Sequence, residues 1–221
     1  MSQSQTFAVI FDMDGVLVDS TMEIRIAFKK TFETLGFKLD PMSNPKYSGR
    51  SLADQVSLWK EDYGIDAGDP NVFSRKAFAF EKEMIATKSA DLELRRLLIE
   101  LKDKGVPMGV GTSSKGYRAE EILTMLGIRD FFAALVTADD VTEHKPNPHV
   151  FLEVARHLKT PPEKCVVIED AATGVEAARN GCMKSIGFLT EWNSEEELSR
   201  ADGVIRGFAE LSYDGLASML A

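Results

Sequence analysis

The sequence predicts an α/β fold in which a parallel sheet carries helices on both faces and a helical domain interrupts the sheet after its first strand. From about residue 90 onward, short apolar runs rich in β-branched residues alternate with helical patterns. Such alternation is typical of a parallel sheet whose strands are joined by right-handed crossovers. The preceding stretch of about seventy residues shows helical periodicity alone. We therefore divide the chain into a discontinuous Rossmann-like core, residues 1–19 and 90–221, and a helical cap, residues 20–89.

The first strand is predicted at residues 7–10, where apolar residues follow one another without alternation. This pattern is typical of a strand buried on both faces. The sequence Ser20-Thr21-Met22-Glu23 matches a capping box and predicts that the first helix of the insertion begins there. Within the insertion, Trp59, Tyr63 and the stripe from Phe73 to Phe80 recur at helical spacing. We expect the faces that carry them to form the core of the helical cap.

The later elements follow from their apolar runs and from the glycines and prolines that punctuate them. In chain order we expect a helix that ends at Gly105, a strand at 106–111, a helix at 117–126, a strand at 134–138, a helix with Pro148 in its first turn, and strands at 165–168, 184–188 and, more weakly, 203–205.

The bulk properties exclude several classes of function. The 221 residues carry a net charge of -9, which argues against electrostatic binding of nucleic acid or of anionic lipid. No run approaches the roughly 20 apolar residues of a membrane span, and the polar N-terminus has no signal-peptide pattern. Cys165 and Cys182 are therefore expected to be reduced core thiols. We expect a cytoplasmic monomer whose partner is a small molecule.

Polar side chains stand where the predicted strands end, which is where open α/β sheets place their ligands. Taken singly, each of these groups has a structural explanation, since Asp-Gly and Thr-Ser-Ser are common in turns, Lys-Pro in solvated loops and Glu-Asp in helix caps. Their occurrence at successive strand ends favours a functional site. The residues are Asp12 and Asp14, Thr112 with Ser113 and Ser114, Lys145, and Glu169 with Asp170.

This set of residues suits phosphoryl transfer. Asp12 can attack phosphorus to form an aspartyl-phosphate. A hard cation such as Mg²⁺ would remove the repulsion between the two anions, with Asp170 as a further ligand and Glu169 adjacent to it. Thr112 and Lys145 can stabilise the equatorial oxygens, and we count Ser113 among the expected substrate contacts. Asp14 can protonate the leaving alcohol and later deprotonate water.

The four motifs resemble those of the haloacid dehalogenase superfamily, in its branch of small-molecule phosphatases and β-phosphoglucomutase-like proteins. They are Phe11-Asp12-Met13-Asp14-Gly15-Val16-Leu17-Val18-Asp19-Ser20, Gly111-Thr112-Ser113-Ser114, Lys145-Pro146-Asn147-Pro148, and Ile168-Glu169-Asp170 with the residues that follow. The resemblance implies that Asp12 is the nucleophile and Asp14 the acid/base. It also implies Mg²⁺ on Asp12, on the backbone carbonyl of Asp14 and on Asp170, with Glu169 in or beside the coordination shell.

The same resemblance implies that the helical insertion is a cap that closes over the substrate. Ser48-Gly49-Arg50-Ser51 resembles the cap loop that reaches the cleft, so Arg50 is a candidate substrate contact, although a surface arginine before a helix is an equal alternative. In β-phosphoglucomutases the residue twelve positions after the nucleophile is a histidine of the cap. Here that position is Ile24, which favours hydrolysis over mutase chemistry.

We therefore expect a Mg²⁺-dependent phosphatase of a small phosphomonoester of the sugar or polyol phosphate type. A phosphomutase of the β-phosphoglucomutase type is the alternative within the enzymes. Two alternatives are not enzymes. One is a protein that accepts a phosphoryl group without turnover, as signalling receiver domains do, and the other is a binding protein without activity. The base at Asp14 and the helical insertion argue against a receiver domain.

Overall fold

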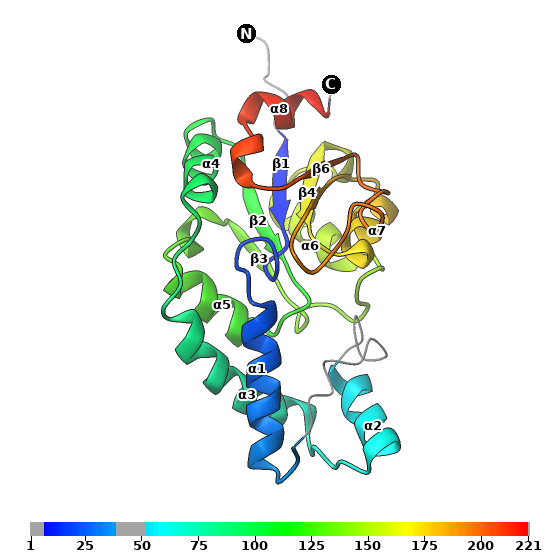
Figure 1. The fold of residues 1–221 in the computed structure, drawn as a ribbon. Coiled ribbons are helices and arrows are strands. Elements are labelled where there is room, and N and C mark those ends of the chain that lie inside the picture. Colours follow the sequence, from blue (N-terminus) through cyan, green and yellow to red (C-terminus); the bar gives the residue numbers. More distant parts are fainter. Residues whose placement is uncertain (1–6, 39–51, 221) are drawn as a thin grey trace. The chain divides into compact units, whose positions relative to one another are not determined.

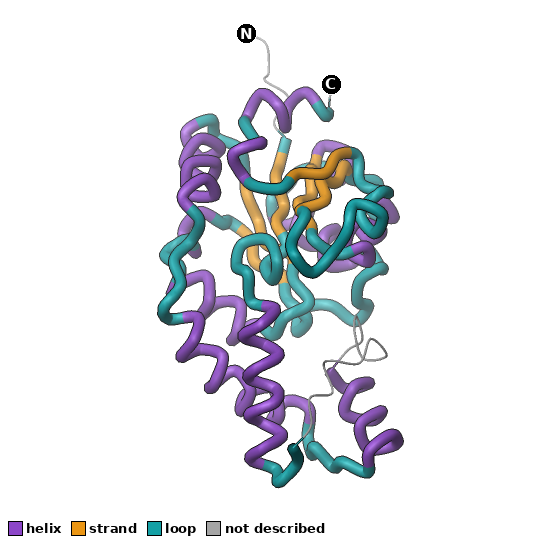
Figure 2. The backbone as a smooth tube through the Cα atoms, viewed as in Figure 1, coloured by secondary structure: helices purple, strands orange, loops and turns teal. Residues whose placement is uncertain are grey.

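The computed structural model describes residues 7–38 and 52–220. The chain forms two compact units, one composed of Met1–Asp19 and Ser89–Ala221 and the other of Ser20–Lys88. All strands among the described residues belong to the first unit, whereas the described residues of the second form helices and loops (Figure 2). The chain therefore leaves the sheet after its first strand and returns to it after a helical segment.

A parallel sheet of six strands, counted over the described residues, forms the centre of the first unit. In spatial order the strands are β3, β2, β1, β4, β5 and β6. All neighbouring pairs are parallel, so their carboxyl ends share one edge of the sheet. The predicted α/β fold class is confirmed. The bounds are Ala8–Phe11 for β1, Met108–Gly111 for β2, Ala134–Val136 for β3, Cys165–Glu169 for β4, Lys184–Phe188 for β5 and Gly203–Ile205 for β6.

Helices cover both faces of this sheet. Figure 1 shows α4 and α5 on one side and α6 and α7 on the other, while α8 contacts α4. Ala8 and Ile10 of β1 are fully buried in a cluster that includes residues of α6 and α7, and the alternation of side chains along a strand sends Val9 and Phe11 to the opposite face. The bounds are Leu92–Asp103 for α4, Gly116–Met125 for α5, His149–His157 for α6, Ala172–Asn180 for α7 and Tyr213–Ser218 for α8.

The helical unit has an aromatic core of its own. Its described helices are α1 (Thr21–Thr34), α2 (Leu52–Tyr63) and α3 (Pro70–Ile85). Trp59 of α2 packs against Phe32 of α1 and Phe73 of α3, with ring centroids 4.8 Å and 5.4 Å away. All three side chains are at most 1% exposed, as the helical spacing predicted for Trp59 and Phe73. This core gives the helical unit a means of stability that does not depend on the sheet.

Three local predictions were wrong. Ser20 does precede α1, but its side chain makes no capping hydrogen bond, because its backbone (φ -117°, ψ -1°) is not in the extended conformation that a capping box requires. Glu23 instead pairs with Lys88 at 2.9 Å.

Tyr63 is exposed at the end of α2, beyond the buried face. Cys165 is a buried free thiol as predicted, but Cys182 is exposed because it follows α7 on the surface.

No helix among the described residues is long and apolar enough to cross a membrane.

Candidate active site

The sheet topology brings the predicted polar residues to one edge. Asp12 follows β1, Thr112 follows β2, and Glu169 ends β4, and these three strands are neighbours in the sheet. The backbone continues the pairing past the strand ends, since the amide of Asp12 donates to the carbonyl of Ile168 at 2.9 Å. Lys145 comes from the loop between β3 and α6. The site therefore lies at the carboxyl ends of the central strands, as the sequence predicted.

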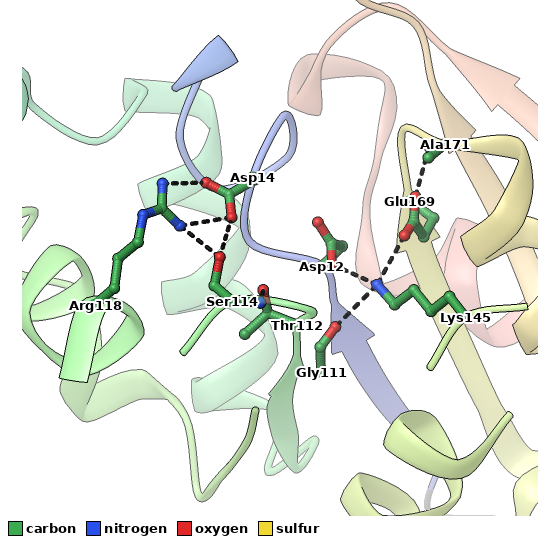
Figure 3. A network of polar contacts seen from close by, with 9 residues as sticks. All are labelled: Asp12, Asp14, Gly111, Thr112, Ser114, Arg118, Lys145, Glu169 and Ala171. Atoms are coloured by element: carbon green, nitrogen blue, oxygen red, sulfur yellow. Dashed lines mark hydrogen bonds and ion pairs between the residues drawn. The ribbon is translucent and has the colours of Figure 1, made fainter. Parts of the chain in front are cut away.

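Lys145 is the centre of a buried charge cluster. Its Nζ donates to Oδ1 of Asp12 at 2.5 Å, to Oε1 of Glu169 at 2.8 Å and to the carbonyl of Gly111 at 3.2 Å (Figure 3). The Lys145, Asp12 and Glu169 side chains are only 7%, 8% and 2% exposed. Nζ also lies 4.5 Å from the centre of the Phe151 ring, a cation–π contact. We call Asp12, Lys145, Glu169 and the adjacent Asp170 the Asp12 cluster.

The Asp12 cluster holds more negative than positive charge. Burial is the main cause that raises the pKa of Asp12 to about 7; the ammonium of Lys145 opposes this rise and the charge of Glu169 contributes to it. Burial, together with the charges of Glu169 and Asp12, likewise raises the pKa of Asp170 to about 9. Burial lowers the pKa of Lys145, but the two carboxylates outweigh it and raise that pKa above its usual value. One ammonium is thus too little positive charge for three ionised carboxylates.

The carboxylates of the Asp12 cluster are close enough together to hold a cation. One oxygen from each of Asp12, Glu169 and Asp170 lies within 4.8 Å of the others. Both oxygens of Glu169 already accept hydrogen bonds, Oε1 from Lys145 and Oε2 from the amide of Ala171 at 2.6 Å. Asp170 is half-buried, and no described residue donates a hydrogen bond to its carboxylate. An oxygen-only donor set with an unsatisfied carboxylate fits a hard divalent cation.

Gly15 keeps the loop after β1 close to Asp170. It has a φ of +81°, and a Cβ at this position would lie 1.9 Å from Oδ2 of Asp170. The loop is closed by hydrogen bonds from the amides of Leu17 and Val18 to the carbonyl of Met13, and from Gly15 to Val18. A side chain at position 15 would both strain the backbone and displace the carboxylate. The Asp-x-Asp-Gly motif therefore requires glycine for two separate reasons.

Asp14 has different partners from Asp12. Arg118 of α5 donates from Nη1 to Oδ2 and from Nη2 to Oδ1, both at 2.7 Å, and the hydroxyl of Ser114 donates to Oδ2 at 2.6 Å (Figure 3). We call Asp14, Ser114 and Arg118 the Asp14 cluster. Sequence reasoning missed Arg118. A usable signal was its position on the buried face of α5 together with Ile122, because an unpaired arginine is rarely buried.

The remaining predicted residues differ in what surrounds them. Thr112 is buried beside the site, and its hydroxyl accepts a hydrogen bond from the amide of Ser114 at 3.1 Å, so it also shapes the turn after β2. Ser113 is exposed. Arg50 lies outside the described residues. The structure thus brings Asp12, Lys145, Glu169 and Asp170 together, with Thr112 adjacent.

Comparison with known proteins matches this chain to a family of hydrolases and to phosphatases within it. The sequence model of the family described as "Haloacid dehalogenase-like hydrolase" matches residues 9–188. Fructose-1-phosphate phosphatase of Escherichia coli (strain K12) is 32% identical and covers 80% of this chain and 94% of its own. Validoxylamine A 7'-phosphate phosphatase of Streptomyces hygroscopicus subsp. limoneus is 29% identical, covering 92% and 95%. The β-phosphoglucomutase structure from Clostridium difficile has a TM-score of 0.82 at 25% identity, covering 97% of each chain.

Proposed function

The chain belongs to the haloacid dehalogenase-like hydrolase family, and from this premise we propose that it is a Mg²⁺-dependent phosphatase of small phosphomonoesters. The substrate class is a sugar or polyol phosphate, and the reaction passes through an aspartyl-phosphate on Asp12. The observation that carries the proposal is the Asp12 cluster, in which a buried ammonium contacts the carboxylate of Asp12 at the carboxyl ends of the central strands. The names of the relatives, which include phosphatases of phosphorylated sugars, support the substrate class.

Asp12 is the phosphoryl acceptor in this mechanism. Its carboxylate attacks phosphorus, the bond from phosphorus to the substrate oxygen breaks, and an acyl phosphate forms on Asp12. Lys145 lies 2.5 Å from Oδ1 and 2.8 Å from Glu169, so it orients the nucleophile and places a positive charge beside the transferred group. Thr112 follows β2, the strand next to β1, and we expect its hydroxyl to contact a phosphoryl oxygen, with Ser113 following it.

Asp12, Asp170 and the backbone carbonyl of Asp14 would hold Mg²⁺, with Glu169 in or beside its shell. The cation supplies positive charge that relieves the repulsion between the carboxylate of Asp12 and the phosphate. The excess negative charge of the Asp12 cluster and the unsatisfied carboxylate of Asp170 support this assignment. Glu169 is the weakest ligand candidate, since both of its oxygens are engaged by Lys145 and Ala171.

Asp14 transfers protons in both half-reactions. It gives a proton to the leaving alcohol when Asp12 is phosphorylated, and it takes a proton from the water that hydrolyses the acyl phosphate. Its position two residues after Asp12, in the loop closed by Gly15 and Val18, keeps it next to the nucleophile along the chain. The division of roles between two neighbouring carboxylates distinguishes a hydrolase from a protein that only stores a phosphoryl group.

The helical unit, which we place at residues 20–89, is the part of the chain that we propose selects the substrate. Support comes from its own aromatic core, which lets it act as one body. Arg50 stays a candidate contact to a second polar part of the substrate. The net charge of -9 supports a small metabolite rather than nucleic acid or an anionic membrane as the partner.

Mutase activity is the second candidate, since a β-phosphoglucomutase structure matches along 97% of this chain. A mutase must protect its acyl phosphate from water until a sugar hydroxyl arrives. Ile24 of α1 stands where β-phosphoglucomutases carry a histidine, and it can neither donate nor accept a hydrogen bond. We therefore expect β-glucose 1-phosphate with a trace of β-glucose 1,6-bisphosphate to yield inorganic phosphate. Glucose 6-phosphate forming much faster than phosphate would favour the mutase.

The direct test of the proposed function is a panel of phosphorylated metabolites, assayed for phosphate release with Mg²⁺ and with EDTA. We expect release from one or more sugar or polyol phosphates, and none in EDTA until Mg²⁺ is restored. Ca²⁺ should inhibit, because its larger and looser coordination sphere would misplace Asp12. Full activity in EDTA would contradict the metal assignment. No release from the panel or from para-nitrophenyl phosphate would contradict the enzyme.

A further inference from the structure

We propose that Arg118, together with Ser114, is a positioning residue that fixes the carboxylate of Asp14 for proton transfer. This inference rests on the proposed function, since it assigns Arg118 a task only if Asp14 is the acid/base of a phosphatase. It adds to that function a residue that lies outside the four motifs.

The members of the Asp14 cluster are joined to one another by hydrogen bonds. The two Nη atoms of Arg118 contact the two carboxylate oxygens of Asp14 at 2.7 Å each, which is the parallel two-point geometry that orients a carboxylate plane. Ser114 donates to Oδ2 at 2.6 Å and accepts from Nη1 of Arg118 at 2.5 Å. Each member therefore contacts both others, and rotation of the carboxylate would break several of these bonds together.

Helix stability does not explain the position of Arg118. It is the third residue of α5, and a positive charge in the first turn of a helix is unfavourable with respect to the helix dipole. Its side chain is only 8% exposed, so the guanidinium has lost most of its hydration. The contacts to Asp14 and Ser114 offset both costs. The placement thus indicates that Arg118 is present for what it does to Asp14.

A general acid/base needs such an orientation. It must lie within hydrogen-bond reach of the proton that it transfers, and small errors in placement lower the rate. The side chain of Asp14 is 26% exposed, compared with 8% for Asp12, so burial alone restricts it less. Arg118 and Ser114 supply the restriction that burial does not.

The experiment is a double-mutant cycle on turnover of para-nitrophenyl phosphate and of the best sugar or polyol phosphate, both with Mg²⁺. Arg118→Met removes the two-point contact and should lower kcat about tenfold to a hundredfold on the sugar or polyol phosphate, with KM nearly unchanged. Arg118→Lys keeps the charge but not the fork, and should recover only part of the loss. In an Asp14→Asn background, Arg118→Met should cause little further loss, because it acts through Asp14.

A matched control is Arg129→Met, which removes a partly buried arginine that follows α5, pairs with Glu120 of that helix and donates to the carbonyl of Phe132, away from Asp14. It should leave kcat near the wild-type value. Ser114→Ala is the smaller change and serves in the same cycle if Arg118→Met does not fold by circular dichroism. Three outcomes would overturn the inference. The first is that Arg118→Met lowers kcat by the same factor in the Asp14→Asn background as in the wild type. The others are that Arg118→Lys restores the full wild-type kcat, or that Arg118→Met turns over faster than the wild type. If the wild type releases no phosphate, the proposed function fails first and this inference with it.

Discussion

Asp12 and Asp14 lie two residues apart on one loop, yet the Asp12 cluster and the Asp14 cluster give these two aspartates different surroundings. Asp12 is buried beside an ammonium, which contacts it at one oxygen, and beside two further carboxylates. Asp14 is partly exposed and is held at both oxygens by a guanidinium. The Asp12 cluster has one ammonium for three carboxylates, whereas the Asp14 cluster pairs one carboxylate with one guanidinium and a hydroxyl. This difference in surroundings, between two residues of the same type, supports our proposal that Asp12 is the nucleophile and Asp14 the proton carrier.

The largest effect is expected from a change at Asp12, the proposed nucleophile. Asp12→Asn keeps the shape of the side chain but removes the attacking anion. We expect turnover to fall to background with every substrate, a loss of at least about a thousandfold, while the fold survives. Phosphate release with Mg²⁺ measures the effect, and circular dichroism checks the fold. Near-normal turnover by Asp12→Asn would contradict the proposed attack of Asp12 on phosphorus.

Asp14→Asn tests the other half of the comparison. We expect a loss of roughly 10²–10⁴-fold with a sugar or polyol phosphate, because its alcohol leaves poorly without a proton. The loss in kcat/KM should be smaller with para-nitrophenyl phosphate, whose leaving group needs no acid. The measurement is the ratio of the two losses in kcat/KM, which reports the phosphorylation of Asp12 and not the hydrolysis step that both substrates share, with Asp12→Asn as the reference. An equal loss with both substrates would argue against the acid role.

Gly15→Ala should damage the Asp12 cluster without replacing any of its charged residues. The added Cβ would meet Oδ2 of Asp170 at 1.9 Å, so the carboxylate must move. We expect the Mg²⁺ concentration for half-maximal activity to rise by about 10–100-fold, as for other changes around metal sites.

Gly36→Ala is the matched control, because Gly36 has a φ of +85° but no atom within 4 Å of a Cβ. It should carry the same backbone strain and leave the Mg²⁺ dependence unchanged. Equal behaviour of the two variants would mean that strain, and not the approach of Asp170, explains the need for glycine at position 15.

Stability without a divalent cation should depend on pH through the Asp12 cluster. The raised pKa values of Asp12, about 7, and Asp170, about 9, mean that the folded state keeps protons that the unfolded chain has released. The free energy of unfolding should therefore fall as pH rises through these values. Thermal unfolding in EDTA and in Mg²⁺, at about pH 6 and about pH 9, measures this, and Mg²⁺ should raise the Tm more at the higher pH. A Tm in EDTA that rises with pH over this interval would contradict the charge imbalance.

The smallest effect is expected outside both clusters. Arg50→Ala should raise KM for the true substrate by about tenfold or less and hardly affect para-nitrophenyl phosphate, which has no second polar group. Comparison of KM for the two substrates is the measurement. An equal change with both would mean that Arg50 is structural or acts on the phosphate itself.

The two clusters also differ in how far the sequence predicted them. The buried run before Asp12 and the polar residues after successive strands predicted both the sheet and the Asp12 cluster, because parallel strands bring their carboxyl ends together. The reach of Lys145 to both Asp12 and Glu169 needed the structure, since it comes from a long loop. Arg118 was missed because a single arginine in a helix resembles a solvated surface residue. The capping box at Ser20 failed because the incoming loop sets the backbone there.

The most direct test of the account traps the intermediate on Asp12 in the variant that lacks the proton carrier. Asp14→Asn is mixed with para-nitrophenyl phosphate and Mg²⁺, quenched in acid and mapped by mass spectrometry. Because the variant should form the acyl phosphate faster than it hydrolyses it, we expect a burst of about one para-nitrophenol per enzyme. We also expect a phosphoryl group on the peptide that contains Asp12. A linear time course with no modified Asp12, in a variant that still turns over, would contradict the assignment of Asp12 as nucleophile and Asp14 as its base.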